Sequence, residues 1–568
     1  MFREILLEPL QRLLKELPRP DDYLLPRILL AIDEAGNLLT KLDGKLDTLR
    51  ITAIRRVLRS LTAYHIWVVF LSTNGRMETF TTSQAEDPST RVERGQLNRI
   101  APYVSLELHV EERRRRMANK SEKLKPMSQF ATNEHTTGFG RPLWRLYSTK
   151  SYTELSEFVL TKVLRGGDVR YMPRNKYQAF AAVSSRVTLN PSENEESVQL
   201  AWASIHYHLG ILVSVNMQKG TLLTTTASEP VVSDAVANLL MGVSPGPVTE
   251  INWVPTLQTL VNDLLNTGVV GRGTRGELYC QIILICARDI LLSGKTSSGP
   301  RPDFHMSRPF SFQGFLDTLL GDNVACNAYA CRIGVPLANM PERQGPAYLI
   351  SDGHCNFSHF VFTNQNLKSE TFADLLLDLL RSNAALQLSH GQANWDQLIP
   401  VYFGDPNAEI NLSKLGAMFI QAKNRIDSEN MRLFACDYAK YLPPGALVLY
   451  LQVEAGVEAL KGPTTSAPMP VFTQKKNARK LRKPKEPFVL GIQLYGHYVE
   501  NFPFLKNRPG LFNAIKGIVD GIRIPKQGIT GAVRERLWGH HPMGYFSAAT
   551  TATVDQDGDS QMKEPGNR

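Results

Sequence analysis

Long apolar runs and paired cysteines are both missing from this sequence. No stretch approaches the roughly 18 uninterrupted apolar residues of a membrane-spanning helix, so we expect no membrane span. There are only 6 cysteines, and they form no CxxC pair and no Cys/His set with zinc spacing. We interpret them as reduced core thiols of an intracellular protein. Residues 1–18 read as an amphipathic helix that contains acids, so we do not expect this segment to be a secretory signal.

Size and charge set the broad class. The chain has 568 residues, too many for one ordinary domain, so we expect two or three. Hydrophobic residues make up 43% and charged residues 21%, which is enough apolar material for real cores. The formal net charge of +10 suits an anionic partner, of which nucleic acid is the commonest. A basic protein without such a partner is the alternative interpretation.

The N-terminal segment, residues 1–85, has the pattern of a βαβ unit. A short apolar run over 28–32 predicts a buried parallel strand, 51–61 a helix, and 66–71 a second strand. Polar residues follow both strands, at the carboxyl ends where parallel sheets bind ligands. These residues are Asp33, Glu34, Thr73 and Asn74.

The strings ILLAIDEAGNLL and IWVVFLSTNGRM resemble the Walker B and sensor strands of an AAA- or STAND-type P-loop NTPase. The resemblance implies that Asp33 orients magnesium, Glu34 polarises the hydrolytic water, and Asn74 or Thr73 is the sensor. No GxxxxGK motif precedes Asp33, so we expect a degenerate, N-terminally truncated unit that does not use ATP by itself. The Gly-Lys-Thr at 294–296 is interpreted as a loop, and GRGTRG at 271–276 as the turn into a helix.

The middle of the chain divides by pattern into two parts. Residues 86–150 look irregular and basic, with four arginines at 113–116, and are interpreted as a connector. Residues 151–268 carry a helical pattern, from which we predict an all-α region that could bind a protein partner. His206 and His208 lie in this region, and we interpret them as structural residues.

A third region, 270–500, alternates helical and strand-like segments, with a weakly patterned insertion over 292–368. Apolar runs predict a helix at FADLLLDLLRSN and strands at AALQLSH, LIPVYF, LGAMFIQAK, ALVLYLQV and PFVLGIQLYG. We therefore expect an α/β/α mixed sheet here, within an α/β multidomain chain. The residues after 547 read as a disordered polar tail.

Two of these strands carry a candidate metal site. Asp396 begins the LIPV strand, and Gln421 and Lys423 end the following strand; they are two apart and so share a face. Phosphodiester cleavage needs a hard cation to polarise the phosphate and to lower the pKa of the attacking water. Asp396 would supply a carboxylate oxygen, Gln421 an amide oxygen and Ala422 its carbonyl, while Lys423 would hold the water and offset transition-state charge.

The Asp396 … Gln421-Ala422-Lys423 arrangement resembles the PD-(D/E)XK restriction-endonuclease-like superfamily, in the QxK form that some modification-dependent enzymes carry. That resemblance implies another acid in a preceding helix after a glycine, and Glu277 fits. It also implies a Mg²⁺- or Mn²⁺-dependent endonuclease acting on DNA. The alternative is an inactive nuclease fold that only binds nucleic acid or protein.

The overall order of segments is similar to fungal crinkler-type and transposon-linked NTPase–nuclease fusions. SRVTLNP at 185–191 and TTTASEPVVSDAVANLLM at 224–241 are also similar to that group. A basic segment at 475–485 is interpreted as a nuclear import signal or a phosphate-binding loop, with a solvated loop as the alternative. Its candidate nucleic-acid-binding residues are Lys475, Lys476, Arg479, Lys480 and Arg482.

Overall fold

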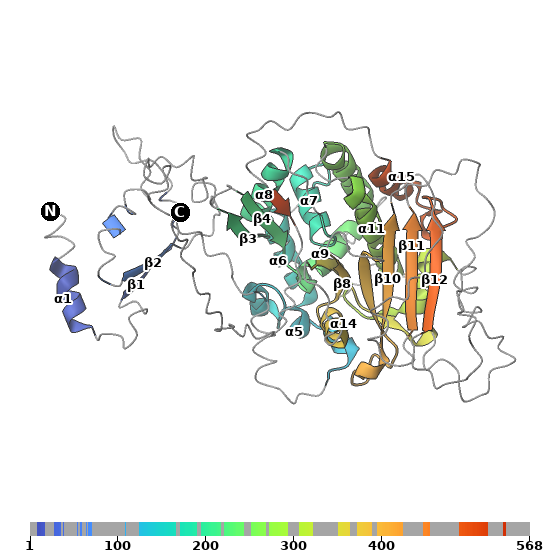
Figure 1. Cartoon of the computed structure of the whole chain (residues 1–568), viewed down its shortest axis with the longest axis horizontal. Coiled ribbons are helices and arrows are strands. Elements are labelled where there is room, and N and C mark those ends of the chain that lie inside the picture. Colours follow the sequence, from blue (N-terminus) through green and yellow to red (C-terminus); the bar gives the residue numbers. More distant parts are fainter. Residues whose placement is uncertain are drawn as a thin grey trace, which may run out of the picture.

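The structure is a computed structural model, shown in Figure 1. It describes residues 8–17, 28–33 and 66–70, a few single residues between 35 and 108, then 124–165, 171–189, 195–216, 221–242, 251–267, 272–293, 306–321, 350–363, 372–388, 395–423, 447–454, 488–520 and 538–540. Among these residues, no helix is both long enough and apolar enough to cross a membrane.

An eight-stranded mixed sheet is the centre of the fold (Figure 1). Its members are β5 (Phe310–Ser311), β6 (His354–Cys355), β7 (His359–Phe362), β8 (Ala384–Gln387), β9 (Gln397–Tyr402), β10 (Leu415–Lys423), β11 (Leu447–Glu454) and β12 (Phe488–Tyr495). Strands β8, β9 and β10 pair antiparallel, whereas β10, β11 and β12 run parallel. All five strands predicted from β8 to β12 are confirmed.

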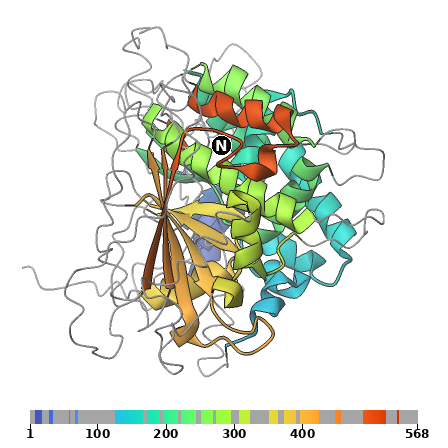
Figure 2. The same cartoon turned by 90° about the vertical axis from the view of Figure 1, so that its right-hand side faces the viewer.

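Helices cover both faces of this sheet. One face carries the long helix α11 (Arg272–Ser293), with α12 (Phe312–Leu320) and α15 (Pro509–Val519) packed against it. The other face carries α14 (Phe372–Arg381), whose leucines form a second core with the sheet. Figure 2 shows the fanned strands with the helices beside them. The alternation of side chains along each strand explains the two cores, because Met418 and Ile420 join the first and Phe419 joins the second.

The region 151–268 is not all-α, so that prediction was wrong. It contains helices α6 (Tyr152–Leu164), α7 (Lys176–Ser184), α8 (Glu195–Tyr207), α9 (Pro230–Met241) and α10 (Trp253–Thr259). Between α8 and α9 lie two antiparallel strands, β3 (Gly210–Asn216) and β4 (Thr221–Thr226), and β13 (Trp538–His540) extends this sheet. The sequences GILVSVN and TLLTTT are rich in β-branched residues, and this strand signal was missed.

The helical region and the mixed sheet share one hydrophobic core. A single cluster of buried side chains runs from Trp144 through Leu257 and Ile283 to Leu451 and Ile518. The expected domain boundary at 268/270 therefore does not divide the hydrophobic core. The sheet-bearing region also continues beyond 500, because α15 packs on α10 and α11.

Two further sequence boundaries need correction. The expected insertion 292–368 supplies β5, β6, β7 and α12, which are parts of the sheet and its helical cover. Within the expected irregular connector 86–150, the described residues 124–150 are packed: Met127 and Phe130 join the α14-side core and Trp144 joins the other. Their aromatic and methionine side chains gave no periodic pattern because these segments are short 3₁₀ turns.

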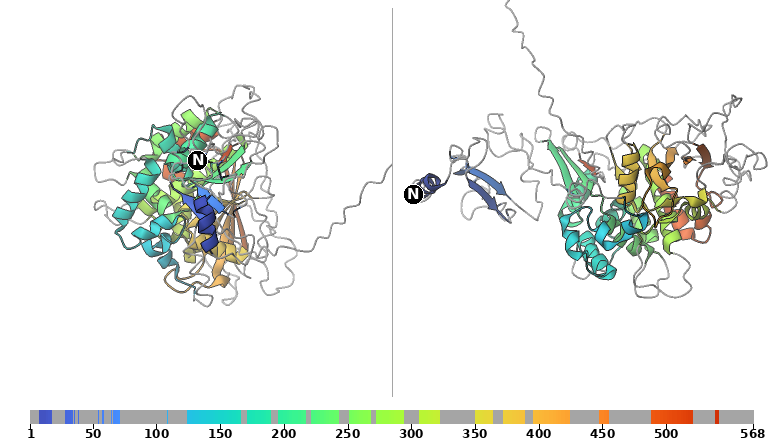
Figure 3. Two further views of the ribbon diagram at one scale, coloured as in Figure 1. Left: turned by 90° about the vertical axis from the view of Figure 1, so that its left-hand side faces the viewer. Right: turned by 90° about the horizontal axis from the view of Figure 1, so that it is seen from below.

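The N-terminal part contains a short helix, α1 (Glu8–Glu16), and two parallel strands, β1 (Ile28–Ile32) and β2 (Ile66–Phe70). Both strands and their parallel pairing agree with the prediction. The expectation that the first strand is buried is wrong, since Leu29 is 61% exposed; on the second strand Trp67 is 56% exposed. Figure 3 shows this pair apart from the larger body.

Candidate active site

Asp396 lies where β9 begins and β10 ends. Its backbone N–H donates to the carbonyl of Ile420 at 2.8 Å, and its own carbonyl accepts from the N–H of Leu388 at 2.9 Å. Its carboxylate is turned toward β10, because Oδ2 accepts from the backbone N–H of Ala422 at 2.8 Å. Asp396 therefore touches the Gln421–Lys423 segment directly. A carboxylate held by a backbone N–H is fixed in direction, as a metal ligand needs to be.

The segment Gln421–Lys423 forms the last three residues of β10, as predicted, and pairs with β11. The Gln421 side chain is half-buried, and its Oε1 accepts from the hydroxyl of Tyr450 at 2.8 Å. Because Tyr450 packs in the α14-side core, the Gln421 amide lies on that face of the sheet. The backbone of Lys423 pairs with Glu454, while its side chain lies outside the described residues.

Glu277 approaches from the opposite face, on the first turns of α11. Its carboxylate Oε2 accepts from Nε2 of Gln387 at 3.0 Å, and its backbone carbonyl accepts from Nε2 of Gln397 at 2.8 Å. These two glutamines stand opposite each other on β8 and β9. Glu277 is thus hydrogen-bonded to β8 and to β9, the strand that begins directly after Asp396. In the sequence, 119 positions separate the two acids.

Electrostatics connect Glu277 with Asp396 through Cys280. The pKa of the Cys280 thiol is raised well above its ordinary value, first by burial, then by the charges of Asp396 and Glu277. The carboxylates of Asp396 and Glu277 therefore both lie close enough to the Cys280 thiol to raise its pKa. Cys280 remains a protonated thiol, together with the other buried free cysteines, Cys286 and Cys355. For these three, the interpretation as reduced core thiols is confirmed.

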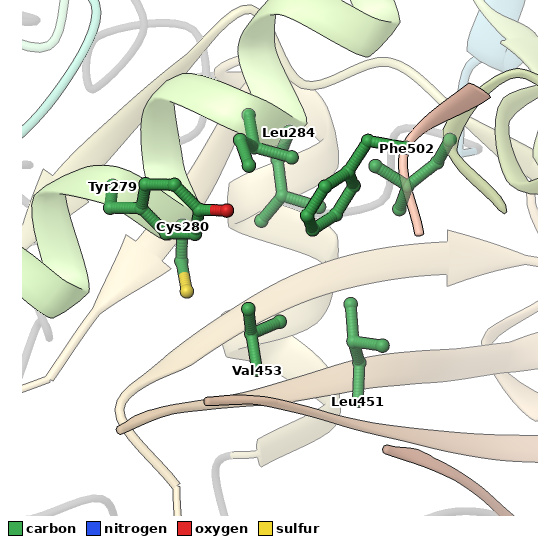
Figure 4. A pocket seen from close by; sticks show the side chains of 8 residues that line it. Tyr279, Cys280, Leu284, Leu451, Val453 and Phe502 are labelled. Carbon is green, nitrogen blue, oxygen red and sulfur yellow. The ribbon is translucent and has the colours of Figure 1, made fainter. Parts of the chain in front are cut away.

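A small cavity next to Cys280 has an apolar lining. Figure 4 shows Tyr279 and Cys280 from α11 facing Leu451 and Val453 from β11, with Phe502 closing one side. Such a lining offers a metal or a phosphate no ligand oxygens apart from one phenol. This cavity is therefore not part of the candidate metal site around Asp396.

Three buried glutamines in this site were missed by the sequence analysis. Gln281, Gln387 and Gln397 are at most 2% exposed and come from α11, β8 and β9. The available signal was their position, because each lies within or at the start of an apolar run: QIILI, AALQL and QLIPV. A buried amide costs free energy unless its hydrogen bonds are made, so a glutamine in a core strand marks a specific partner.

The donor set fits a hard divalent cation only in part. Asp396 and Glu277 would offer carboxylate oxygens, which Mg²⁺ and Mn²⁺ prefer. Among the described residues, no three His, Cys, Asp or Glu side chains are grouped to hold a metal. A third protein ligand would therefore be a backbone oxygen such as that of Ala422, because the Gln421 amide lies on the opposite face of the sheet from Glu277 and already accepts from Tyr450.

Other sequence-predicted sites are placed as follows. Asp33 follows β1 in a turn, whereas Glu34 and Asn74 lie outside the described residues. The Gly-Lys-Thr at 294–296 and the basic runs at 113–116 and 475–485 also lie outside them, so the five basic candidates of the latter remain predictions.

His208 is structural, as predicted. Its Nδ1 bonds the carbonyl of Val163 at 2.6 Å, and burial lowers its pKa. His206 packs against Trp202. The GRGTRG segment is not a turn that precedes the helix, as was predicted, because α11 begins at Arg272 and residues 272–276 are its first turns.

No protein-family model, no curated protein and no solved structure matches this chain.

Proposed function

We propose that this protein is a Mg²⁺- or Mn²⁺-dependent phosphodiesterase that cuts DNA, of the PD-(D/E)XK type with glutamine at the second position. The supporting observation is the hydrogen bond between the Asp396 carboxylate and the N–H of Ala422. It joins the acid to the Gln-x-Lys segment across neighbouring strands. Glu277 adds a second carboxylate from the covering helix, and the net charge of +10 suits a polyanionic substrate.

Each residue has a distinct task in this proposal. Asp396 and Glu277 would hold the cation, which when bound polarises the phosphate and lowers the pKa of a water. Lys423 would hold that water and take up its proton, then stabilise negative charge on the phosphoryl oxygens. Tyr450 would keep the Gln421 amide oxygen turned in one direction through its hydrogen bond. The N-terminal unit remains a proposed degenerate NTPase module, and a crinkler-like fusion remains a proposed origin.

The test compares cleavage of supercoiled plasmid by wild type, Asp396→Asn and Lys423→Ala, with Mg²⁺ or Mn²⁺ and with a chelator. We expect metal-dependent nicking by wild type and a loss of more than about 100-fold in both variants, beyond the roughly 10–100-fold that outer-shell changes cost. Asp405→Asn is the matched control, because Asp405 is an exposed acid in the loop between β9 and β10. A Lys423→Ala protein that cuts as fast as wild type would disprove the mechanism.

A binding-only role is the second candidate, favoured by Gln421. An amide brings no negative charge, and its Oε1 already accepts from Tyr450, so the site lacks one strong ligand. The same experiment separates the two functions. A salt-sensitive gel shift with no nicking at any metal concentration would indicate a nucleic-acid-binding module.

A further inference from the structure

A chain of side-chain amides leads from the protein interior to the Glu277 carboxylate. The backbone N–H of Thr188 donates to Oε1 of Gln281 at 2.7 Å, and Nε2 of Gln281 donates to Oε1 of Gln387 at 2.6 Å. Nε2 of Gln387 then donates to Oε2 of Glu277 at 3.0 Å. Gln281 also donates to the hydroxyl of Thr188 at 2.6 Å, so both of its polar atoms are used.

The first hydrogen bond, donated by the backbone N–H of Thr188, fixes which atom donates and which accepts in each later bond of this series of amides. A backbone N–H can only donate, so the atom of Gln281 that bonds the backbone N–H of Thr188 must be its oxygen. Its nitrogen must then face Gln387, which therefore presents oxygen to Gln281 and nitrogen to Glu277. The Thr188 N–H thus requires that Gln387 present a hydrogen-bond donor, and not an acceptor, to the Glu277 carboxylate.

A donor at this position favours one orientation of the two Glu277 oxygens. Oε2 is held by Gln387, and the backbone carbonyl of Glu277 is held separately by Gln397. The side chain and the main chain of this residue are therefore fixed by different glutamines. Such an arrangement has a cost, because buried amides stabilise a fold only when fully bonded, and Oε1 of Gln397 has no hydrogen-bond partner.

We propose that Gln387 is a positioning residue, which orients the Glu277 carboxylate for a divalent cation through the Gln281–Gln387 amide chain. This inference rests on the proposed function, since it deepens the role of the same site. A ligating carboxylate whose outer partner is lost typically gives up about 10–100-fold in metal affinity. Gln387 would therefore act on affinity through Glu277, without contact with the substrate.

The test measures Mn²⁺ binding to the full-length, metal-free protein by isothermal titration calorimetry. Gln387→Met removes the donor but keeps the length of the side chain, and we expect its Kd to rise about 10–100-fold. Gln178→Met is the matched control, because it removes another buried amide, one that bonds the backbone of Met172 and Leu164 away from Glu277. We expect its Kd to stay within about threefold of wild type, since the carboxylate keeps its partner.

Each outcome separates the positioning role from the proposed function. Wild type that binds Mn²⁺ no better than Asp396→Asn would overturn both. Equal affinities of wild type and Gln387→Met, or equal losses in Gln387→Met and Gln178→Met, would overturn the positioning role alone. If thermal unfolding shows that Gln387→Met does not fold, Gln281→Met tests the chain one step further away. A smaller loss of affinity would support the proposal, and no loss would overturn it.

Discussion

We predict that protonation of the buried ring of His497 lowers the free energy of unfolding in mild acid. It lies just after β12 and is 7% exposed; its Nδ1 bonds the hydroxyl of Tyr279 at 2.7 Å, and its Nε2 the carbonyl of Phe512 at 3.0 Å. A carbonyl accepts only, so Nε2 carries the proton and Nδ1 accepts from the phenol. This neutral ring joins α11 to α15, and protonation of Nδ1 would remove the acceptor that Tyr279 uses.

The magnitude follows from the pKa of His497, which is lowered from 6.5 to about 4, mainly by burial and further by the charge of Lys516. Above pH 6.5 both folded and unfolded chains carry a neutral ring. As the pH falls below 6.5, the unfolded chain binds a proton that the folded chain takes up only near pH 4. At about 1.4 kcal/mol per pKa unit, roughly 3 kcal/mol of unfolding free energy is lost across this window.

The assay is urea unfolding followed by tryptophan fluorescence, at pH values from 7 to 4, for wild type and His497→Gln. Glutamine supplies one donor and one acceptor but does not titrate, so the wild-type free energy should fall by about 3 kcal/mol more than that of the variant. Other acid-labile groups, including His208, are present in both proteins and cancel. Parallel pH profiles for the two proteins would refute the reasoning.

Two further predictions concern buried ion pairs. Asp289→Ala should lower the free energy of unfolding by about 3–5 kcal/mol in urea denaturation, because Arg186 and Arg288 are fully buried and both donate to this carboxylate; a loss below about 1 kcal/mol would contradict this account. Glu229→Gln should cost about 1–3 kcal/mol, measured the same way, because the ion pair with Arg141 is lost while the amide oxygen can still accept from the indole of Trp144; unchanged stability would show that the ion pair contributes nothing.

The strands of the mixed sheet could be predicted from sequence because their signal is local. Each of the last five strands is a short apolar run with turn residues around it, and α14 has a clear helical spacing. The neighbouring placement of Asp396 and the Gln421–Lys423 segment also follows from this signal. Two successive strands with a short connection tend to pair antiparallel.

The rest depends on contacts between distant segments, which leave no local pattern. Strands β5 and β6 have two residues each, too few for a period of two to be visible. The bond between Gln387 and Glu277 spans 110 positions, and that between Thr188 and Gln281 spans 93. The only local sign of these hydrogen bonds is a glutamine within or beside an apolar run. The sequence pattern did not predict the common core of the helical region and the sheet, because that core also depends on contacts between distant segments.

The sheet topology explains why the candidate site lies at one edge. Because β9 runs antiparallel to β10, the amino end of β9, where Asp396 lies, must meet the carboxyl end of β10. Strands β11 and β12 are parallel to β10, so their carboxyl ends share that edge, and the register aligns Lys423 with Glu454 and Glu454 with Tyr495. Ligands of open α/β sheets bind beyond the carboxyl ends of parallel strands. The change from antiparallel to parallel pairing at β10 therefore places Asp396 at the edge formed by the carboxyl ends of the parallel strands, and α11 carries Glu277 on one face of the sheet.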